Sequence, residues 1–400
     1  MMAVDLDRYA TFLEKVAEEL DIPPGKYQDA VNRYQAVGSW LEDGTYPGGM
    51  GEPSIYPQGS FRLGTVVRPI RGCVEADYDI DLICELPITK HLTDARSVKM
   101  MVGERLNEHE RYHKLLDEEG NRCWTLEYAE QDGIGFHLDV LPSVPDWRGG
   151  PLDTSIAITN RQGKTYDWSA SNPKGYGEWF DARNRKAFNL VLTEQKRSIH
   201  SRASAIYASV DDVPDQLVRT PLQRSIQIMK RHRDSRFNRG NKYDYAPISI
   251  IITTLAAQFY QGDSDVHSAL KSIITQLYAH AVLVENRTVD RCIAPVSPIS
   301  RSSDGRWYIG NPVNPEENFA DRWHEDNHAR ARAFFSWVEA LKEDFVDILT
   351  MMKPETVRNR LTKVLGSSVV SDHLGLIVPP PAAFNTPKIH ITTPARPWRA

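Results

Sequence analysis

The chain has 400 residues, enough for two domains or one large one with a buried core. Its formal net charge is −5 at pH 7, and its only strong basic cluster covers residues 230–240, so an extended nucleic-acid template is not expected. Four scattered cysteines without a C-x-x-C pair argue against a zinc ribbon and a disulfide framework, and favour a reducing cytoplasm. No apolar run reaches the roughly 20 residues that cross a bilayer, and the N-terminus lacks a signal core.

The first half of the chain alternates helical and β-prone patterns. Residues 5 to about 42 are predicted to be helical with an interruption at 21–26, because apolar residues recur at helical spacing. A turn-rich loop follows at 42–54. Four β-prone segments come next, with a polar helix over about 94–118 between the second and third: 65–70, 77–86, 123–129 and 136–144. This order predicts a small mixed sheet with helices packed against it.

After about residue 205 the pattern is mostly helical. One predicted helix carries an apolar face formed by Leu222, Ile226 and Met229. The next, over 247–260, starts with Pro247 in the favoured first turn and is apolar enough to be buried. A further helix is expected to begin near Pro315 and to carry four aromatic residues, Phe319, Trp323, Phe334 and Trp337. The Pro-rich end of the chain is predicted to be an extended tail.

The stretch YDIDL, residues 78–82, places Asp79 and Asp81 on one face of a predicted strand and apolar residues on the other. Two like charges held this close repel each other, so the pair taken alone fits a solvated face better than a functional site. Just upstream, the sequence PQGSFRLGT contains Gly59 and Ser60, which suit a turn that approaches an anion, although such a pair is often a plain turn. Downstream, Asp139 lies among alternating apolar residues.

Taken together, three carboxylates on strand-like segments behind a Gly-Ser turn indicate a metal-dependent phosphoryl chemistry. Magnesium prefers hard oxygen ligands and leaves room for substrate phosphates. A two-metal site stabilises both the attacking and the leaving oxygen of an in-line displacement. We therefore predict nucleotidyl transfer, with Asp79, Asp81 and Asp139 as catalytic residues that hold Mg²⁺ or Mn²⁺.

The block GSFRLGTVV, DYDIDL and HLDVLP resembles the nucleotidyltransferase superfamily of poly(A) polymerases, oligoadenylate synthetases and cGAS. Later blocks, among them WSASNPKGYGEWF and NPVNPEENFADRW, resemble the bacterial cGAS/DncV-like nucleotidyltransferases (CD-NTases) of CBASS anti-phage defence. The resemblance implies an α+β fold with a polymerase-β-like nucleotidyltransferase domain and a C-terminal helical, oligoadenylate-synthetase-like domain. The expected divisions are 1–205 for the core with its N-terminal helices, 206–378 for the helical domain, and 379–400 for the tail.

The resemblance also implies roles for individual residues. Gln58, Gly59 and Ser60 would hold the donor triphosphate, and a lysine and a serine of the helical domain, matched here by Lys230 and Ser249, would contact its phosphates. Without the resemblance, Lys230 would fit a solvated basic helix face better. Asn172, before the aromatics Trp179 and Phe180, could read a base edge in the cleft or belong to a turn that packs in the core. The extra acid Asp77 has no assigned role.

The expected activity is synthesis of a cyclic di- or trinucleotide from ATP and other nucleoside triphosphates in a bacterial cytoplasm, with a separate effector that reads the product. Two alternatives stay open: an RNA-end nucleotidyltransferase of the poly(A) or CCA type, and a nucleotide-binding sensor that has lost catalysis. The tail, which ends in Ala400, either docks a HORMA-type partner, is conjugated by a ubiquitin-like route, or is an unconstrained end. Base choice, ring size and linkage do not follow from the sequence.

Overall fold

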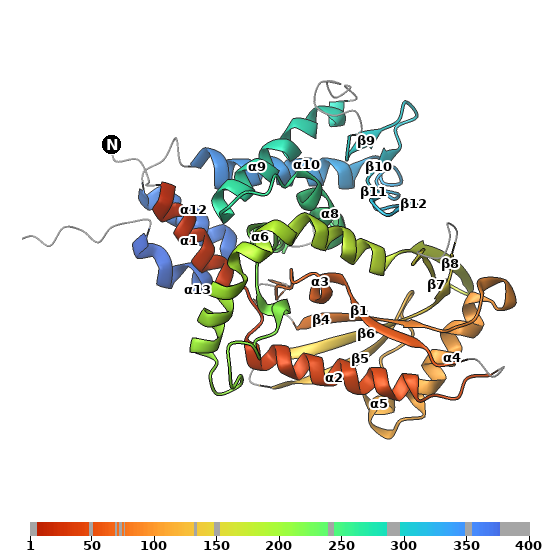
Figure 1. Ribbon diagram of the computed structural model, residues 1–400. Coiled ribbons are helices and arrows are strands. Elements are labelled where there is room, and N and C mark those ends of the chain that lie inside the picture. The colour runs from red at the N-terminus through yellow and green to blue at the C-terminus, as the bar shows by residue number, and fades with distance from the viewer. Residues whose placement is uncertain are drawn as a thin grey trace, which may run out of the picture.

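The computed structural model describes residues 6–47, 51–68, 70–71, 74–75, 77–131, 134–147, 153–238, 244–285, 297–348 and 354–376. The predicted tail, residues 379–400, therefore lies outside the described residues. Figure 1 shows two groups of elements, a sheet with its covering helices below and a helical group above. The expected α+β architecture with a small mixed sheet is confirmed.

The lower group is built on a six-stranded sheet with the order β1-β4-β6-β7-β8, in which β5 also pairs with β6. Its strands are β1 (Ser54–Gln58), β4 (Tyr78–Glu85), β5 (Trp124–Gln131), β6 (Ile134–Pro145), β7 (Ile156–Gln162) and β8 (Thr165–Ser171). β4 and β6 are parallel and the other pairs are antiparallel, so the sheet is mixed. A separate short ribbon is formed by β2 (Ile70–Arg71) and β3 (Val74–Glu75).

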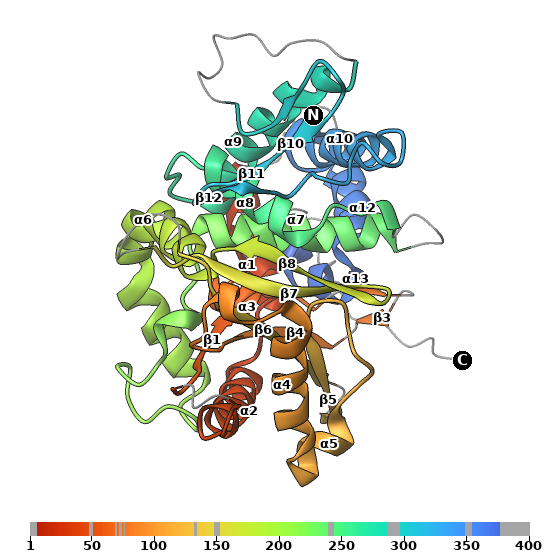
Figure 2. The same cartoon turned by 90° about the vertical axis from the view of Figure 1, so that its right-hand side faces the viewer.

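One face of this sheet is covered by α2 (Pro24–Glu42) and α4 (Ala95–Asn107), with α5 (Glu110–Leu115) beside β5 (Figure 2). Alternate strand residues such as Ile80, Leu82 and Leu138 are fully buried in the core under these helices. Because neighbouring residues on a strand point to opposite faces, the acidic residues between them lie on the other face. The alternation of apolar and acidic residues thus decides which face is left for chemistry.

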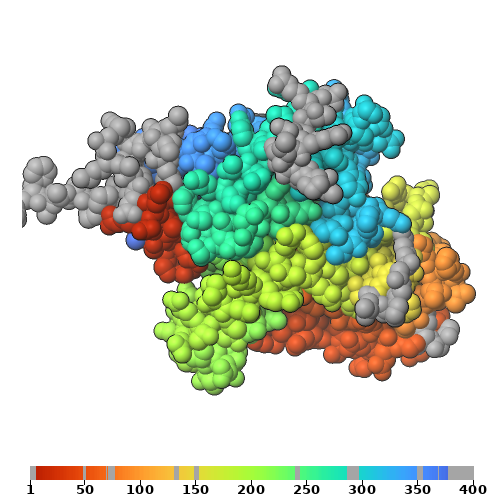
Figure 3. Space-filling view, turned by 45° about the horizontal axis from the view of Figure 1, so that its top comes forward, coloured from red at the N-terminus to blue at the C-terminus, as the bar shows by residue number. Residues whose placement is uncertain are grey.

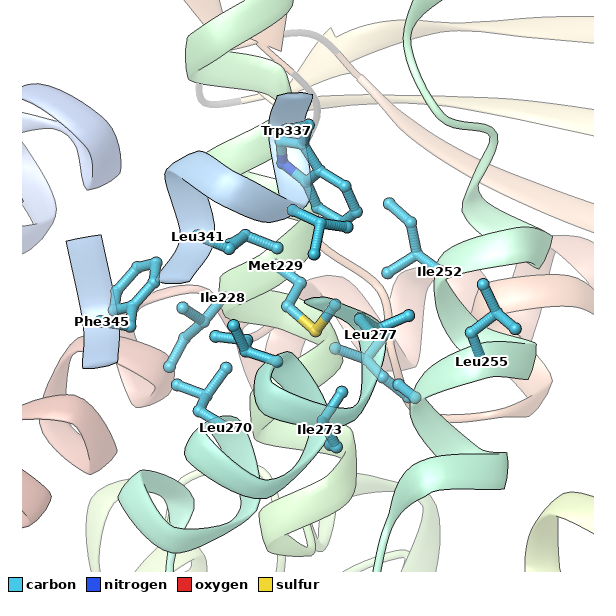
Figure 4. Close-up of a cluster of buried hydrophobic side chains, with 14 of the residues drawn as sticks. Ile228, Met229, Ile252, Leu255, Leu270, Ile273, Leu277, Trp337, Leu341 and Phe345 are labelled. Atoms are coloured by element: carbon cyan, nitrogen blue, oxygen red, sulfur yellow. The ribbon is translucent and has the colours of Figure 1, made fainter. Parts of the chain in front are cut away.

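The upper group is helical and has its own core. Its helices are α7 (Pro221–Phe237), α8 (Ser249–Phe259), α9 (Val266–Ala279), α10 (Ala329–Lys342), α12 (Pro354–Leu365) and α13 (Ser367–Val370). Figure 4 shows apolar side chains of α7, α8, α9 and α10 meeting around Met229. The remaining elements are short: α3 (Gly59–Arg62), η1 (Lys90–Leu92), η2 (Asp215–Leu217), η4 (His280–Glu285), the π-helical η5 (Glu343–Asp347), η6 (Ser371–Leu376), β9 (Ser300–Arg301), β10 (Trp307–Tyr308), β11 (Gly310–Asn311) and β12 (Asn314–Asn318).

Two helices tie the groups together. α1 (Leu6–Glu19) buries Tyr9, Phe12 and Val16 in the core of the upper group, although α2 directly after it packs on the sheet. In Figures 1 and 3 the red α1 accordingly lies against the upper helices. The 30-residue α6 (Pro173–Arg202) starts in the upper core with Phe180 and ends in the sheet core with Ile199. The division of the chain at residues 205 and 378 stays a prediction. The packing shows in addition that α1 belongs with the helical core.

The structure corrects several predicted elements. No helix begins near Pro315: that residue lies in β12, and α10 begins at Ala329, because the rest of β12 and a turn-rich segment occupy the residues between. Trp323 is nevertheless buried. Among the described residues of the predicted strand 65–70, only Ile70 is in a strand. Pro247 lies two residues before α8, and β1, β7, β8 and the helical nature of α6 were not predicted.

Candidate active site

The register of β4 and β6 brings the three predicted carboxylates together. Asp81 lies directly opposite Asp139, and Asp79, two residues earlier on the same face, lies opposite His137. Asp79 is exposed, and Asp81 and Asp139 are partly buried. Residues 60 positions apart in the sequence therefore share one acidic patch on the sheet face opposite α2 and α4. We call Asp79, Asp81 and Asp139 the carboxylate triad.

The predicted Gly-Ser turn lies directly against this triad. β1 ends at Gln58, which pairs with Asp81, and α3 begins at Gly59. The backbone of Gly59 has φ +64°, and a Cβ atom at this position would lie 2.4 Å from Oδ2 of Asp81. Both the positive φ and the missing space exclude a larger residue. Gly59 thus lets the turn, and with it Ser60, approach the carboxylates more closely than any other residue would.

Lys230 reaches the same region from the helical group. Its side chain is buried, and Nζ donates hydrogen bonds to the carbonyl oxygen and Oγ1 of Thr65 at 3.0 and 3.2 Å. Gln227 and Gln223, one and two turns earlier on α7, donate to carbonyl oxygens within residues 63–66 at 3.1 and 2.8 Å. These hydrogen bonds therefore hold the polar face of α7 against residues 63–66, the segment behind the Gly-Ser turn. The alternative of a solvated basic face for Lys230 is wrong.

The electrostatics of Asp81 and Lys230 reflect this crowding. Burial, with repulsion from Asp139 and Asp79, raises the pKa of Asp81 to about 7, although Lys230 acts against the shift. Burial, with repulsion from Arg233, lowers the pKa of Lys230 to about 7. Both groups are thus held away from their ordinary charge state, which a bound cation at the acids and a bound phosphate at the lysine would restore.

Ser249 is linked to α7 by Arg233, a residue that no sequence pattern had marked individually. It is the first residue of α8, and its Oγ accepts a hydrogen bond from Arg233 at 3.0 Å. Arg233 lies almost one turn after Lys230 on α7 and also donates to Asp234 and to the carbonyl of Pro247. The structure therefore places two cations, not one, on the side of α7 that leads to Ser249.

Asn172 has a structural role in the fold. It is the N-cap of α6, where its Oδ1 accepts hydrogen bonds from the backbone N–H of Gly175 at 2.9 Å and from Oγ1 of Thr154 at 2.8 Å. Phe180, eight residues later, is fully buried in the upper core. The turn-and-core interpretation of this segment accounts for these contacts, and base reading by Asn172 stays a prediction.

Two further residues, missed from the sequence, contact the carboxylate triad. Thr125 on β5 lies directly opposite Asp139, and its Oγ1 donates to Oδ1 of Asp139 at 2.6 Å. His137 has Nδ1 3.7 Å from Oδ1 of Asp79 and Nε2 3.6 Å from Oδ2 of Asp77. His137 lies two residues before Asp139 in one predicted strand, so both side chains point to the same face, and this spacing could have identified His137. Thr125 carried no signal, because only strand pairing places it there.

The acid Asp77, which had no assigned role, has a structural one. Its Oδ1 accepts a hydrogen bond from the backbone N–H of Gly135 at 2.9 Å, and this contact ties the start of β4 to the start of β6. Gly135 also leaves no room for a Cβ atom, which would lie 2.4 Å from Oδ2 of Asp77. Asp77 therefore helps to set the parallel register that brings the carboxylate triad together.

The carboxylate triad fits a divalent metal ion by its chemistry. Its oxygens are the hard ligands that such ions prefer, and the burial and neighbouring acids that raise the pKa of Asp81 are effects that a bound cation would oppose. Within the described part of the chain, no three His, Cys, Asp or Glu side chains are already drawn together to hold an ion. A bound cation would offset the mutual repulsion of the acids.

The mixed sheet, the carboxylate triad beside a Gly-Ser turn and the cationic helix above it define a nucleotidyltransferase. Residues 53–142 match the family of the cyclic GMP-AMP synthase DncV-like nucleotidyltransferase domain. The c-di-GMP synthase of Roseivirga ehrenbergii is 32% identical over 340 residues, 84% of this chain and 78% of that protein. The cyclic dinucleotide synthase CdnG of Bradyrhizobium diazoefficiens is 25% identical over 323 residues, 78% of this chain and 70% of that protein.

The chain belongs to the DncV-like nucleotidyltransferases, the CD-NTases, which produce cyclic oligonucleotides. Solved structures share its fold. The CD-NTase CdnG of B. diazoefficiens in complex with GTP superimposes with a TM-score of 0.64 at 22% identity, over 91% of this chain and 98% of that one. The cyclic AMP-GMP synthase DncV of Vibrio cholerae with a linear intermediate gives 0.52 at 15% identity, over 92% and 88%.

Several sequence-based predictions are thereby confirmed: the family, the fold, and an enzyme that transfers nucleotides to make a cyclic oligonucleotide. Nucleotidyltransferases of this superfamily use divalent metal ions. In the parts of the chain that the structure describes, none of the helices has the length and apolar character needed to span a membrane.

Proposed function

We propose that this chain makes a cyclic dinucleotide from nucleoside triphosphates with magnesium, and that GTP is the first substrate to test. The observation that carries the proposal is the pairing of Asp81 with Asp139, beside Asp79 and against Gly59. The relative from R. ehrenbergii, whose name states c-di-GMP synthesis, supports the choice of GTP. The predicted site residues take the following roles under this proposal.

Gly59 and Ser60 bind the donor triphosphate, because the turn approaches the carboxylate triad without a side chain in the way. Lys230 and Arg233 on α7 face the phosphates, with Ser249 at the start of α8 beside them. The burial of Lys230 strengthens its attraction for a phosphate, since few waters compete. Gln58, which precedes Gly59 and pairs with Asp81, fixes the turn to β4.

Asp79, Asp81 and Asp139 would hold the divalent ions, which when bound supply charge neutralisation at the reacting phosphate and its leaving group. The chain itself contributes alignment: the sheet fixes the acids and α7 fixes the cations across from them. A ribose hydroxyl of one nucleotide attacks the α-phosphate of another, a new P–O bond forms, and pyrophosphate leaves. A second such step closes the ring. Alignment and charge stabilisation carry most of the catalysis in transfers of this type.

The test is an incubation of the purified chain with four ribonucleoside triphosphates and Mg²⁺, one of them labelled at the α-phosphate. Phosphatase treatment should leave a small labelled product, because a cyclic dinucleotide has no terminal phosphate. Each triphosphate is then omitted in turn. If the product is c-di-GMP, only the omission of GTP should stop the reaction. Growth of a labelled RNA instead would favour an RNA-end nucleotidyltransferase. The absence of any product with every triphosphate and with Mg²⁺ or Mn²⁺ would contradict the proposal.

Thr125 provides a finer prediction about the carboxylate triad. Thr125→Val should lower the turnover rate about 10-fold and raise the Mg²⁺ concentration needed for half-maximal rate, because Asp139 loses the hydrogen bond that orients it. Thr125→Ser keeps the hydroxyl and should restore most of both values. The measurement is a magnesium titration of the initial rate. A Thr125→Val enzyme with an unchanged magnesium dependence would show that this hydrogen bond does not orient a metal ligand.

The raised pKa of Asp81 predicts how stability depends on pH without metal. A raised pKa in the folded state means that the carboxyl stabilises the fold fully below pH 4, and that this contribution is lost as the pH rises from about 4 to about 7. In EDTA at pH 8, Asp81→Asn should therefore be more stable than the unchanged chain by about 4 kcal/mol. At pH 4 the two should be equal. Denaturant unfolding at both pH values measures this difference.

The wider biological setting rests on the family resemblance. A role in CBASS anti-phage signalling and a separate effector that reads the product stay predictions, as does a HORMA-type or conjugation partner at the tail. The tail lies outside the described residues. Deletion of residues 381–400 tests its role: loss of phage protection in cells with the full operon would support a partner, and unchanged protection would discard it.

A further inference from the structure

A cavity of about 790 Å³ lies in the helical group, away from the carboxylate triad. Its walls come from the C-terminal part of α7, from α10 and from α12, and α7 and α12 pack against each other (Figure 2). Its volume falls within the range of about 300–1,000 Å³ that is typical of small-molecule sites. Its lining combines charged side chains of both signs with apolar side chains, and this combination indicates the kind of ligand that would fit.

The two acidic residues that line the cavity, Asp344 and Glu343, share one cation, Arg360. Oδ2 of Asp344 accepts a hydrogen bond from Nε2 of His232 at 2.9 Å, and Asp344 also bonds Arg360. Arg360 donates in addition to Glu343 at 2.6 Å. The indole N–H of Trp337 donates to Nδ1 of His232 at 3.0 Å, so the single imidazole proton is on Nε2 and the ring is neutral.

Three other cations line the same cavity: Arg236, Arg332 and Lys363. All three are exposed, and among the described residues none of them forms an ion pair with a carboxylate. Arg236 donates to Oγ of Ser336 at 3.2 Å, and Arg332 donates to the carbonyl oxygen of Asn327 at 2.7 Å. With Arg360 the lining carries four cations against two acids, an excess of two positive charges. Guanidinium groups suit phosphate and carboxylate ligands because they donate in pairs.

Apart from Ser235 and Ser336, the rest of the lining is apolar or aromatic, with Phe237, Ala333, Ala340 and Val364 on the walls and the ring of Tyr245, 39% exposed, among them. Such walls fit the organic body of a ligand, and Tyr245 offers a face for a ring. A bare inorganic ion would leave them without a partner. The complementary ligand is a small organic molecule with two or more negative charges.

We propose that this cavity is a regulatory site for a small organic polyanion, phosphorylated or polycarboxylate. His232, which lines it, lies two residues after Lys230 on α7, so one rigid helix connects the cavity with the segment behind the Gly-Ser turn. A ligand that draws α10 and α12 toward α7 acts on the helix that carries Lys230 and Arg233. The regulatory part rests on the proposed function, and the binding part is independent of it.

The test is isothermal titration calorimetry of the full chain in EDTA with GMP and citrate, one phosphorylated and one polycarboxylate probe. Arg332→Glu with Lys363→Glu reverses two exposed charges of the lining, and should weaken binding at least 10-fold. Lys271→Glu with Arg322→Glu reverses two exposed charges elsewhere in the helical group and should leave binding within 2-fold. Asp79→Ala should also bind normally, because it alters only the catalytic face. Product formation with the better probe present should change in the unaltered chain and not in the cavity variant.

Several outcomes would overturn the proposal. If neither probe bound saturably to the unaltered chain, the proposed site would not exist. Binding that survives in the cavity variant would place the ligand elsewhere. Loss of binding in Asp79→Ala would assign the probe to the catalytic site. Saturable binding in the cavity with no effect on the rate of product formation would overturn the regulatory part. A chain that binds normally but makes no product at all would instead count against the proposed function.

Discussion

Asp79→Ala, Asp81→Asn and Asp139→Asn should each lower the rate of product formation by about 10³-fold or more. Each removes a charged oxygen ligand from the acidic patch that the pairing of β4 and β6 creates. Stabilisation of transferring phosphoryl charge by a metal ion is worth several kcal/mol, and about 4 kcal/mol corresponds to that loss of rate. The measurement is conversion of α-labelled triphosphate to phosphatase-resistant product. Folding is checked by the thermal unfolding temperature of each variant.

Glu127→Gln provides the matched control for these three variants. Glu127 is an exposed acid on β5 whose Cα is paired with that of His137, so it lies on the same face of the sheet. It is outside the carboxylate triad, and we expect its loss to change the rate less than 3-fold, as about 0.6 kcal/mol would. If Glu127→Gln were as inactive as Asp79→Ala, general loss of negative potential would explain the effect. Full activity of all three triad variants would contradict the proposed metal site.

Arg224→Met should destabilise the fold by about 3 kcal/mol and loosen α1. Arg224 is 4% exposed on α7, and it donates to Asp21 at 2.7 Å and to the carbonyl oxygen of Ala17 at 3.0 Å. Its Nε also lies 3.3 Å from Glu14. Removal of Arg224 leaves Glu14 and the carbonyl of Ala17 without this cation, and takes one of its partners from Asp21, which is the costly way to break a buried pair. Denaturant unfolding measures the loss of stability.

The same variant should become sensitive to proteolysis between α1 and α2, since Arg224 is one of the contacts that hold α1 in the upper core. Lys15→Ala is the control, because Lys15 forms an exposed pair with Glu18 on α1 and its loss should cost at most about 0.5 kcal/mol. An Arg224→Met chain as stable as the original, and cut no faster, would mean that apolar packing alone holds α1. In that case Phe12→Ala should produce the loosening instead.

The sequence was most informative where the local pattern and the final environment agree. The helix break at 21–26, the strand at 77–86 and the apolar face of Met229 could be predicted, because hydrophobic periodicity is set by which face is buried. The acids Asp79, Asp81 and Asp139 could be chosen because their residue type and strand-like setting already limit their chemistry. The family followed from the same short blocks.

The errors arose where contacts between distant segments override local preference. The helix expected near Pro315 has aromatic residues at plausible spacing, but the β11–β12 ribbon and the turns after it occupy those residues instead. The chain after residue 54 forms β1 because it pairs with β4, a partner that the local sequence does not reveal. The separation of α1 from α2 into different cores likewise depends on packing that no short window contains.

The sequence by itself thus determined the family, the chemistry of the carboxylates and the existence of a cationic helix, because these depend on residue type and local order. Only the tertiary structure decided that Asp81 meets Asp139, that Gly59 lies against Asp81, and that Lys230 is buried against Thr65. These contacts join residues between about 20 and 165 positions apart. Strand register and helix docking are collective properties of the fold, since each contact is stable only when the others are in place.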